Sequence, residues 1–597
     1  MAVVAGQVTL DASVVVRCRR RVHLDHDPTA AGLPRAEPDP ALEQRRTDSM
    51  AHREEIGVLL AGLVGAGGPH GSGGGSRVGP GWVVVPSGPG AERQRLTEQA
   101  MAEGAAYIWN ALLPHSGGRR GDVDLLVRTP AASSGAQTGP GGGLGPGGGV
   151  GPGGGVGPGG GVGPARYRPL IVVRHRISDP GSGALTSPLS SPHAEDAAVD
   201  PTRRARSHPR DQLRLAHLTR MLESSGHAVP DGPAFGAVIG MDADVVVWHE
   251  LSAPSWPGGH STLQEYDVRF ADRAAVAAAA QARRPALAQP SRIMECRRCP
   301  WWPTCEAELT ARSDVSLVLR GEDAAAARAV GVTTVAQLAA LDPREEPPVV
   351  LHGAPYADAV ALARAWLKGL PVVRRVADVS VPRADVEVDV DMESFGESGA
   401  YLWGALLSLP GGADVGHEPG YRAFATWEPL PTDDEARSFA EFWGWLRAIR
   451  ADCAERGLTF AAYCYNEQAE NRWMLGSADR FAGYPGMPSR EEVTEFITSD
   501  LWVDMFALVS KWFLCAHGKG LKRIAPVAGF AWSDPEASGE NSMRWYRDAV
   551  AMDGGRPCEV QRERLLRYNA DDVHATHILR EWMCSPALAE IPLAAEL

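Results

Sequence analysis

Lysine is nearly absent from this sequence. The 597 residues contain four lysines, all in the second half of the chain: Lys368, Lys511, Lys519 and Lys522. Arginine supplies the other positive charges, and its guanidinium group stays protonated, so it does not reproduce the proton chemistry of a lysine. Any catalytic site in the first 367 residues must therefore work without a lysine.

Long apolar runs are also missing. No stretch of about 18 apolar residues occurs, so we expect no transmembrane helix. The N-terminus has no basic region ahead of its apolar part, which argues against a signal peptide and for a cytoplasmic protein. The nine cysteines would be reduced there, so a tight cysteine cluster indicates metal binding. The net charge of −14 does not exclude a nucleic-acid partner, because basic patches such as RCRRRVH at 17–23 remain.

Several segments have a clear pattern. Strands are predicted at 121–128, 167–176 and 242–251, and helices at 210–224 and 268–284. The Gly-Pro repeat at 139–164 reads as an expanded surface loop, and the Ser- and Pro-rich stretch 183–210 as a second loop. Two short helices at 321–341 resemble a helix-hairpin-helix unit, with a plain helical linker as the alternative.

Three cysteines lie close together in MECRRCPWWPTCEAEL, at Cys296, Cys299 and Cys305. Cys-x2-Cys spacing lets two thiolates reach one metal ion, and the third cysteine adds a third ligand. A zinc site or an iron–sulfur cluster usually has four ligands. The only other cysteine in the first 452 residues is Cys18.

This arrangement resembles the RecB-type nucleases that carry an iron–sulfur cluster, including the CRISPR-associated RecB-like exonucleases. The resemblance implies a 4Fe–4S cluster held by Cys18, Cys296, Cys299 and Cys305, which joins the two ends of the nuclease domain. A zinc ion on the same four cysteines is the alternative.

The RecB resemblance also implies a nuclease site, and here the sequence departs from the family pattern. Asp124 matches the first metal-binding aspartate, with Asp122 on the same strand face, and Gln212 matches the glutamine of the following helix. Val172 and Arg174 stand where the family has an acid and a lysine. We therefore expect a degenerate domain that binds DNA without cutting it. A rewired site using Asp122, Asp124 and His175 is the alternative.

The stretch ADVEVDVDMES is the richest candidate for catalysis. Valines and a methionine alternate with four acids, so one strand face is apolar and the other carries Glu387, Asp389, Asp391 and Glu393. Four like charges in a row repel one another, and a divalent cation would remove that repulsion. A solvated edge strand is the alternative.

A late helix, LLRYNADDVHATHILREWM, supplies the other half of this pattern. Tyr568 and Asp572 lie one turn apart on one face of it. An early Asp-x-Glu strand followed by a late Tyr-x3-Asp helix resembles the RNase H-like DEDD exonucleases. The resemblance implies two-metal hydrolysis, with Asp391, Glu393 and Asp572 as ligands of Mg²⁺ or Mn²⁺ and Tyr568 orienting the attacking water.

Two assignments remain open in this region. The fourth carboxylate of the family is best matched by Glu470, with Asp504 as the second choice. Lys519 and Lys522 lie in GKGLKRIAPVAGF, which lacks the spacing of a phosphate loop, so we expect them to contact substrate phosphates. A plain surface loop is the alternative.

Together these features predict an α/β protein that resembles bacterial RecB-like nucleases with two nuclease-type domains. The expected domains are a restriction-endonuclease-like (RecB-type) domain at 1–312, a helical segment at 313–378 and an RNase H-like domain at 379–597. The expected activity is an exonuclease on single-stranded DNA, and the DEDD resemblance implies the 3′ to 5′ direction. The alternatives are a DNA-binding scaffold that recruits a helicase or repair complex, and an RNA-processing nuclease.

Overall fold

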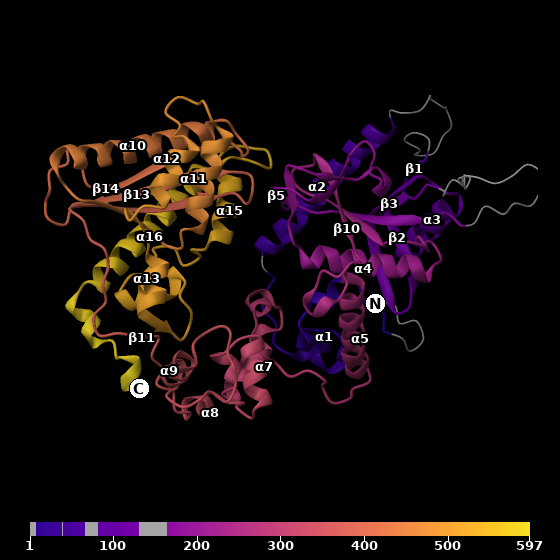
Figure 1. Cartoon of the computed structure of the whole chain (residues 1–597), viewed down its shortest axis with the longest axis horizontal. Coiled ribbons are helices and arrows are strands. Elements are labelled where there is room, and N and C mark those ends of the chain that lie inside the picture. Colours follow the sequence, from indigo (N-terminus) through magenta and orange to yellow (C-terminus); the bar gives the residue numbers. More distant parts are fainter. Residues whose placement is uncertain (1–7, 39, 66–80, 131–163) are drawn as a thin grey trace, which may run out of the picture. The chain divides into compact units, whose positions relative to one another are not determined.

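The computed structural model describes residues 8–38, 40–65, 81–130 and 164–597 (Figure 1). The expanded loop predicted at 139–164 lies outside these ranges except for its last residue. The chain divides into two compact units, one formed by Met1–Gln289 and Arg298–Trp301 and the other by Pro290–Arg297 and Trp302–Leu597. Within the described ranges, no helix combines the length and apolar character needed to cross a membrane.

The first unit is built around an eight-stranded sheet with the order β1-β2-β3-β4-β9-β10-β6-β7. Its strands are β1 (Trp82–Val84), β2 (Tyr107–Ser116), β3 (Arg119–Arg128), β4 (Tyr167–Val172), β6 (Ala184–Pro188), β7 (Ala198–Asp200), β9 (Phe235–Ile239) and β10 (Val245–Glu250), and a separate pair is formed by β5 (Ser178–Pro180) and β8 (Arg203–Ala205). The prediction of a loop at 183–210 is therefore wrong for β6, β7 and β8, whose short length gives little alternation to detect.

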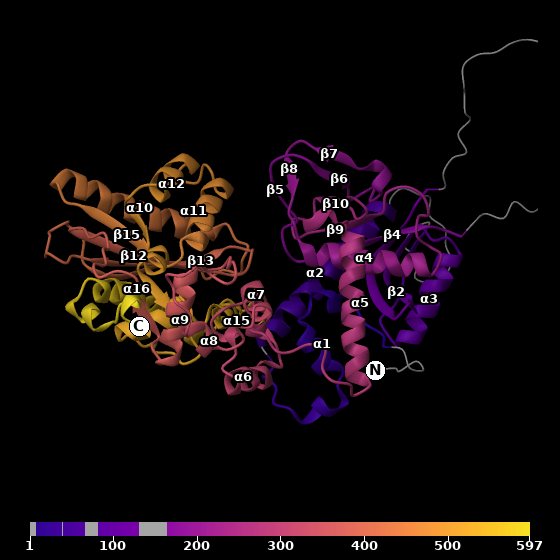
Figure 2. The ribbon, with the colours of Figure 1, turned by 60° about the horizontal axis from the view of Figure 1, so that its bottom comes forward.

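Helices cover both faces of this sheet. They are α1 (Arg19–His26), α2 (Pro40–Gly65), α3 (Gly90–Ala102), α4 (Pro209–Ser224) and α5 (Thr262–Gln281). One apolar core joins the sheet to α4 and α5, and α2 packs into a second core on the other face. Figure 2 shows α4 beside the strands that it covers, and it contacts β2, β3, β4 and β9. The predicted helices at 210–224 and 268–284 are confirmed by α4 and α5.

The second unit begins with a helical part that has its own small core. It comprises α6 (Trp302–Ala311), α7 (Glu322–Ala329), α8 (Val335–Ala339) and α9 (Tyr356–Leu367). The two short helices predicted at 321–341 are confirmed by α7 and α8. The division into three domains at 312/313 and 378/379 stays a prediction.

The remainder of this unit is an α/β domain with a five-stranded sheet in the order β14-β13-β12-β15-β16. The strands are β12 (Val386–Ser394), β13 (Ala400–Ser408), β14 (Gly420–Ala425), β15 (Phe460–Cys464) and β16 (Trp502–Asp504), with β11 (Val372–Arg374) and β17 (Phe513–Cys515) as a separate pair. The helices are α10 (Asp434–Arg456), α11 (Gln468–Arg480), α12 (Arg490–Ile497), α13 (Met505–Trp512), α14 (Leu521–Ile524), α15 (Gly539–Ala549) and α16 (Glu559–Met583).

The alternation along β12 decides how this domain is layered. Val386, Val388, Val390 and Met392 enter a core that includes residues of α10. The acidic side chains point to the opposite face, because neighbouring residues of a strand alternate in direction. Helix α16 contacts β12 and β13, and Figure 1 shows α10 on one side of the sheet and α16 on the other. The acidic face of β12 is therefore covered by the helix that carries Tyr568 and Asp572.

Candidate active site

Three carboxylates meet where β12 passes α16. Asp391 and Glu393 from the strand and Asp572 from the helix each place one oxygen within 4.8 Å of the other two. Glu393 and Asp572 are both 7% exposed. The structure thus brings together the three residues that the sequence predicts as metal ligands.

The helix side of the site follows from a four-residue repeat. Tyr568, Asp572, Thr576 and Arg580 recur at intervals of four, so they lie on one face of α16. All four are buried. Since α16 contacts β12, this face meets the acidic strand along several turns.

Arg580 changes the interpretation of the acidic face. Its side chain is fully buried; Nη2 lies 2.6 Å from Oδ2 of Asp389, and Nη1 is paired with Glu387. The alternating pattern of β12 predicts a row of four acids that repel one another, with a solvated edge strand as the alternative. Both views need correction, because β12 is a central strand and arginine neutralises two of the acids. Only Asp391 and Glu393 remain for a cation.

The electrostatics of the remaining acids are unusual. Burial, with the nearby Asp572 adding to its effect, raises the pKa of Glu393 to about 8. Burial also raises the pKa of Asp391 well above its ordinary range, with Asp572, Glu393 and Glu470 adding to the effect. The pKa of Asp572 is raised by burial, against the lowering effect of Lys522. Such a cluster holds protons unless a cation replaces them.

Neutral donors hold these carboxylates in place. Asn569 donates through Nδ2 to Oδ2 of Asp391 at 2.8 Å. Ser542 donates to Oε2 of Glu393 at 2.9 Å, and Trp532 donates to Oδ1 of Asp572 at 2.6 Å. Because these donors are uncharged, they fix the positions of the carboxylates without cancelling their charge.

The two candidates for the fourth carboxylate differ in their surroundings. Glu470 lies in the first turn of α11, is 3% exposed, and its Oε2 has no hydrogen-bond partner among the described residues. Burial raises its pKa to about 8, and Asp504 and Glu393 contribute. Asp504 instead caps α13, and its Oδ1 accepts hydrogen bonds from the backbone N–H groups of Phe506 and Asn466. Glu470 thus has a carboxylate oxygen without a hydrogen-bond partner among the described residues, whereas Asp504 has a structural role.

Lys522 lies inside the site rather than on a distant surface. Its Nζ donates to the hydroxyl of Tyr568 at 2.8 Å and lies 3.7 Å from Oδ2 of Asp572. Burial, Glu393 and Asp572 raise the pKa of Tyr568 above its ordinary value, so its hydroxyl stays protonated at neutral pH.

Lys519 lies in a separate basic pocket of the second unit. The pocket measures about 430 Å³ and is also lined by Arg292, Arg297, Arg320 and Arg523. Among the described residues, no carboxylate lies within ion-pair distance of Arg297, Arg320, Lys519 or Arg523. Burial and the neighbouring arginines lower the pKa of Arg320. Unpaired cations that gather in one pocket suit an anionic ligand such as a phosphate.

The cysteines are divided between the two units. Cys18 precedes α1 and belongs with Cys299 to the first unit, whereas Cys296 and Cys305 belong to the second. Within the first unit, Trp301 donates to Asp25 at 2.8 Å and stacks under Arg35, so the segment after Cys299 packs on the N-terminal region. The four-cysteine cluster and the choice between iron–sulfur and zinc stay predictions.

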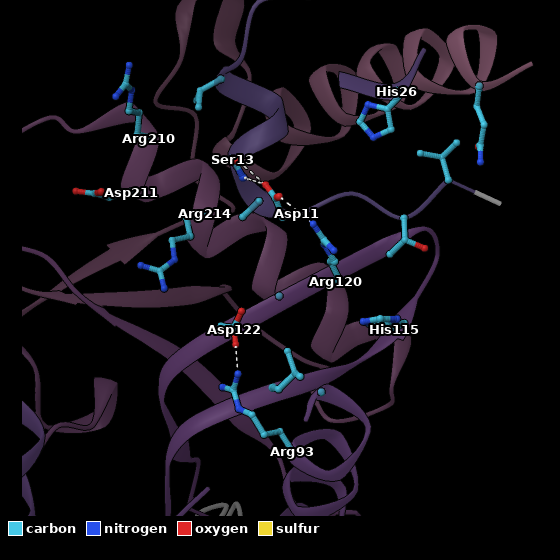
Figure 3. Close-up of a pocket in the computed structure, with 18 residues that line it drawn as sticks. Asp11, Ser13, His26, Arg93, His115, Arg120, Asp122, Arg210, Asp211 and Arg214 are labelled. Atoms are coloured by element: carbon cyan, nitrogen blue, oxygen red, sulfur yellow. Dashed lines mark hydrogen bonds and ion pairs between the residues drawn. The ribbon is translucent and has the colours of Figure 1, made fainter. Parts of the chain in front are cut away.

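The acids of the N-terminal candidate site are all paired with arginine. Asp124 is 3% exposed and accepts hydrogen bonds from Arg53, from Arg214 at 3.2 Å, and from the backbone N–H of Val172 at 2.9 Å. Asp122 lies 2.8 Å from Arg93, and Figure 3 shows this pair in a cavity with several arginines. These arginines neutralise the charge of both carboxylates.

Of the other residues predicted for this site, Arg174 and His175 pair with acids other than Asp122 and Asp124. Arg174 follows β4 and lies 3.6 Å from Asp48, and Gln212 lies on α4. His175 pairs with Asp211 at 3.0 Å rather than with Asp122 or Asp124. The rewired site that uses His175 with the two aspartates is therefore not assembled.

The comparisons with known proteins address the second unit. Residues 488–584 match the model of the RNase_H superfamily. The match includes Asp504, Lys522, Tyr568 and Asp572. No curated protein and no solved structure matches the chain. The C-terminal region is thus RNase H-like, while the RecB-type assignment of the first unit stays a prediction.

Several site residues escaped sequence reasoning. Asn569 is adjacent to Tyr568 and could have been noticed as a polar residue one position from the motif. Ser542, Trp532 and Arg580 gave no signal of their own, since each acts through a contact between distant parts of the chain.

Proposed function

We propose that this protein is a nuclease that uses Mg²⁺ or Mn²⁺ to hydrolyse phosphodiester bonds at the ends of single-stranded DNA. The proposed cutting site is the acidic cluster of the RNase H-like domain. One observation carries the proposal. Asp391, Glu393 and Asp572 share a small buried space with raised pKa values, and this arrangement is unfavourable until a cation binds.

The donor set fits hard divalent cations. Mg²⁺ and Mn²⁺ prefer carboxylate oxygens, and three of them converge here, with Glu470 close enough to interact electrostatically with Asp391 and Glu393. Asp391, Glu393 and Asp572 would hold such ions, which would supply the charge that activates a water molecule and neutralises the scissile phosphate.

The protein side of the mechanism is positioning. Asn569, Ser542 and Trp532 orient the three carboxylates. Tyr568 keeps its proton and can donate it in a hydrogen bond to the attacking water, while Lys522 fixes the phenol oxygen. The positive charge of Lys522 also lies where it can contact a substrate phosphate.

The basic pocket around Lys519 supports a nucleic-acid substrate. Its cations come from the segment just before α6, from the helical part and from the RNase H-like domain, so one strand could contact all three. We propose single-stranded DNA as the partner. RNA would contact the same groups, and only a comparison of the two substrates separates them.

One observation favours the non-catalytic scaffold. Lys522 lies 3.7 Å from Asp572 and supplies a positive charge that a metal ion would otherwise provide. In that case the domain would hold a DNA end for a helicase or repair complex without cutting it.

The test is a cleavage assay with the full chain, Mg²⁺ or Mn²⁺, and end-labelled single-stranded DNA and RNA. Wild type should shorten DNA from one end, Asp391→Asn should not, and Asp124→Asn should behave as wild type. Loss of cutting in Asp124→Asn alone would move the active site to the first unit. A wild type that binds both substrates and cuts neither would favour the scaffold.

A further inference from the structure

A second cluster of metal-ligating side chains lies in the first unit, away from the acids of β3. His175, His208 and Asp211 each place one ligand atom within 4.8 Å of the others. His175 follows β4, and His208 and Asp211 belong to the sequence HPRD, where His208 precedes the first turn of α4 and Asp211 lies in that turn. Two neighbouring elements therefore present three ligands to one point.

The spacing within the cluster suits coordination. Nε2 of His175 lies 3.0 Å from Oδ2 of Asp211, and the rings of His175 and His208 are 4.1 Å apart. Two atoms bound to one zinc ion at about 2.0–2.1 Å in tetrahedral geometry are roughly 3.3 Å apart. Oδ2 of Asp211 is shielded from solvent and makes no hydrogen bond of regular geometry among the described residues.

The backbone fixes which nitrogen of each imidazole is available. Nδ1 of His175 lies 3.2 Å from the carbonyl oxygen of Arg176, and Nε2 of His208 lies 3.0 Å from the same oxygen. A carbonyl oxygen can only accept, so each of these nitrogens carries the proton. Nε2 of His175 and Nδ1 of His208 then keep their lone pairs. Metal-ligating histidines usually donate their other N–H to such a carbonyl.

The surroundings distinguish this cluster from the paired acids nearby. A third imidazole, His249 on β10, is close enough for Asp211 and His208 to influence its pKa, which burial lowers. Asp211 lines the cavity of Figure 3, but its carboxylate points away from Asp122. Unlike Asp122 and Asp124, Asp211 has a histidine rather than an arginine as its ion-pair partner.

We propose that His175, His208 and Asp211 bind a transition-metal ion, with Zn²⁺ as the preferred ion. Imidazole donors suit zinc and its neighbours in the first transition row, whereas Mg²⁺ prefers oxygen. Three protein ligands leave a coordination position open to water or to a ligand in the adjoining cavity. This site is independent of the proposed cutting site. The competing account is an ion pair between a protonated His175 and Asp211, which needs no metal and fits the raised pKa of His175.

The test measures metal content and cobalt spectra of the full chain, in an Asp391→Asn background that removes the acidic cluster. The chain is stripped with chelator and titrated with Zn²⁺ or Co²⁺. His175→Ala and Asp211→Asn should each lose one equivalent of bound metal per chain. His227→Ala should lose none, because His227 contacts the carbonyl oxygen of Ala165 outside the cluster.

Cobalt identifies the ligands. The Co²⁺ ion that binds the parent but not the two variants should give no thiolate-to-cobalt absorption band, because the site contains no sulfur. Equal metal content in His175→Ala, Asp211→Asn and the parent, with all three folded by circular dichroism, would overturn the proposal in favour of the ion pair. Loss of a thiolate band in these variants would also overturn it, because the metal would then sit on cysteines.

Discussion

Asp124 and Asp391 occupy similar places in two different sheets and have opposite electrostatic surroundings. Each lies on a strand in the interior of its sheet and faces a helix that supplies polar groups. Asp124 contacts two arginines, Arg53 and Arg214. Asp391 contacts an asparagine and other acids, and its pKa is strongly raised. The same residue type thus serves as an ion-pair partner in one sheet and as a candidate metal ligand in the other.

The same contrast occurs within a single strand. Glu387 and Asp389 both pair with Arg580. Further along the strand, Asp391 and Glu393 accept hydrogen bonds from neutral donors. Burial alone therefore does not make a metal site. On β12 the deciding feature is whether an arginine lies at the carboxylates, because an arginine there removes the charge that would attract Mg²⁺.

The largest expected effect is loss of a cluster acid. Asp572→Asn should lower the cleavage rate by about 1,000-fold or more, equivalent to about 4 kcal/mol of transition-state stabilisation. Asp571→Asn is the matched control, because Asp571 is the adjacent residue and caps Ser533 instead. Single-turnover rates on end-labelled DNA measure both. Equal losses of cleavage rate in the two variants would show that the rate depends on negative charge on α16 in general and not on the acidic cluster.

The next largest effect concerns the end of β12 whose acids pair with Arg580. Arg580→Met should destabilise the fold by about 3–5 kcal/mol, because the buried Asp389 would keep only His577 beside it and the buried Glu387 only Arg383. Arg447→Met removes an exposed pair with Glu492 and should cost less than about 1 kcal/mol. Urea unfolding compares them. A small loss of stability in Arg580→Met would mean that the ion pairs of Arg580 do not cause the electrostatic difference between the two ends of β12.

A glycine on the neighbouring strand tests the positioning of Asp391. Gly404 pairs with Asp391 in the sheet, and a Cβ there would overlap Oδ1 of Asn569. Gly404→Ala should displace Asn569 and lower cleavage by about 10- to 100-fold, in the range reported for outer-sphere partners of metal ligands. Gly476→Ala in α11 meets no neighbouring atom and should leave cleavage unchanged. Similar cleavage rates for both variants would mean that Asn569 does not position Asp391 for cleavage.

The smallest expected effect is the pH dependence of the metal-free fold. Glu393 and Glu470 have pKa values of about 8 when folded, against 4.5 for an ordinary glutamate. The folded state binds these protons more tightly, so their contribution is present below about pH 4.5 and is lost as the pH rises through 8.

Stability without metal should therefore fall between pH 5 and 8. Mg²⁺ should restore it at pH 8, since metal binding replaces the protons. Denaturant titrations with and without Mg²⁺ measure this. A metal-free fold that gains stability over this window would contradict the raised pKa values.

Regular patterns made much of the fold predictable. The alternation of β12 and the helical periodicity of α4, α5 and α16 are strong local signals, and the structure has these elements where the patterns place them. The resemblance to the DEDD exonucleases also implied that Asp391, Glu393 and Asp572 would meet. The role of Arg580, the capping by Asp504 and the location of Lys522 depend on contacts between distant segments, which no local pattern encodes.

The most direct test of the central claim is a Mn²⁺ titration at pH 8 of wild type, Asp391→Asn and Asp124→Asn, followed by calorimetry. Mn²⁺ favours carboxylate ligands, so it reports on the two acidic sites. The account predicts that Asp391→Asn loses the tightest binding and that Asp124→Asn retains it, because only Asp391 lacks an arginine partner. Loss of the tightest binding in Asp124→Asn, with wild-type binding in Asp391→Asn, would contradict it.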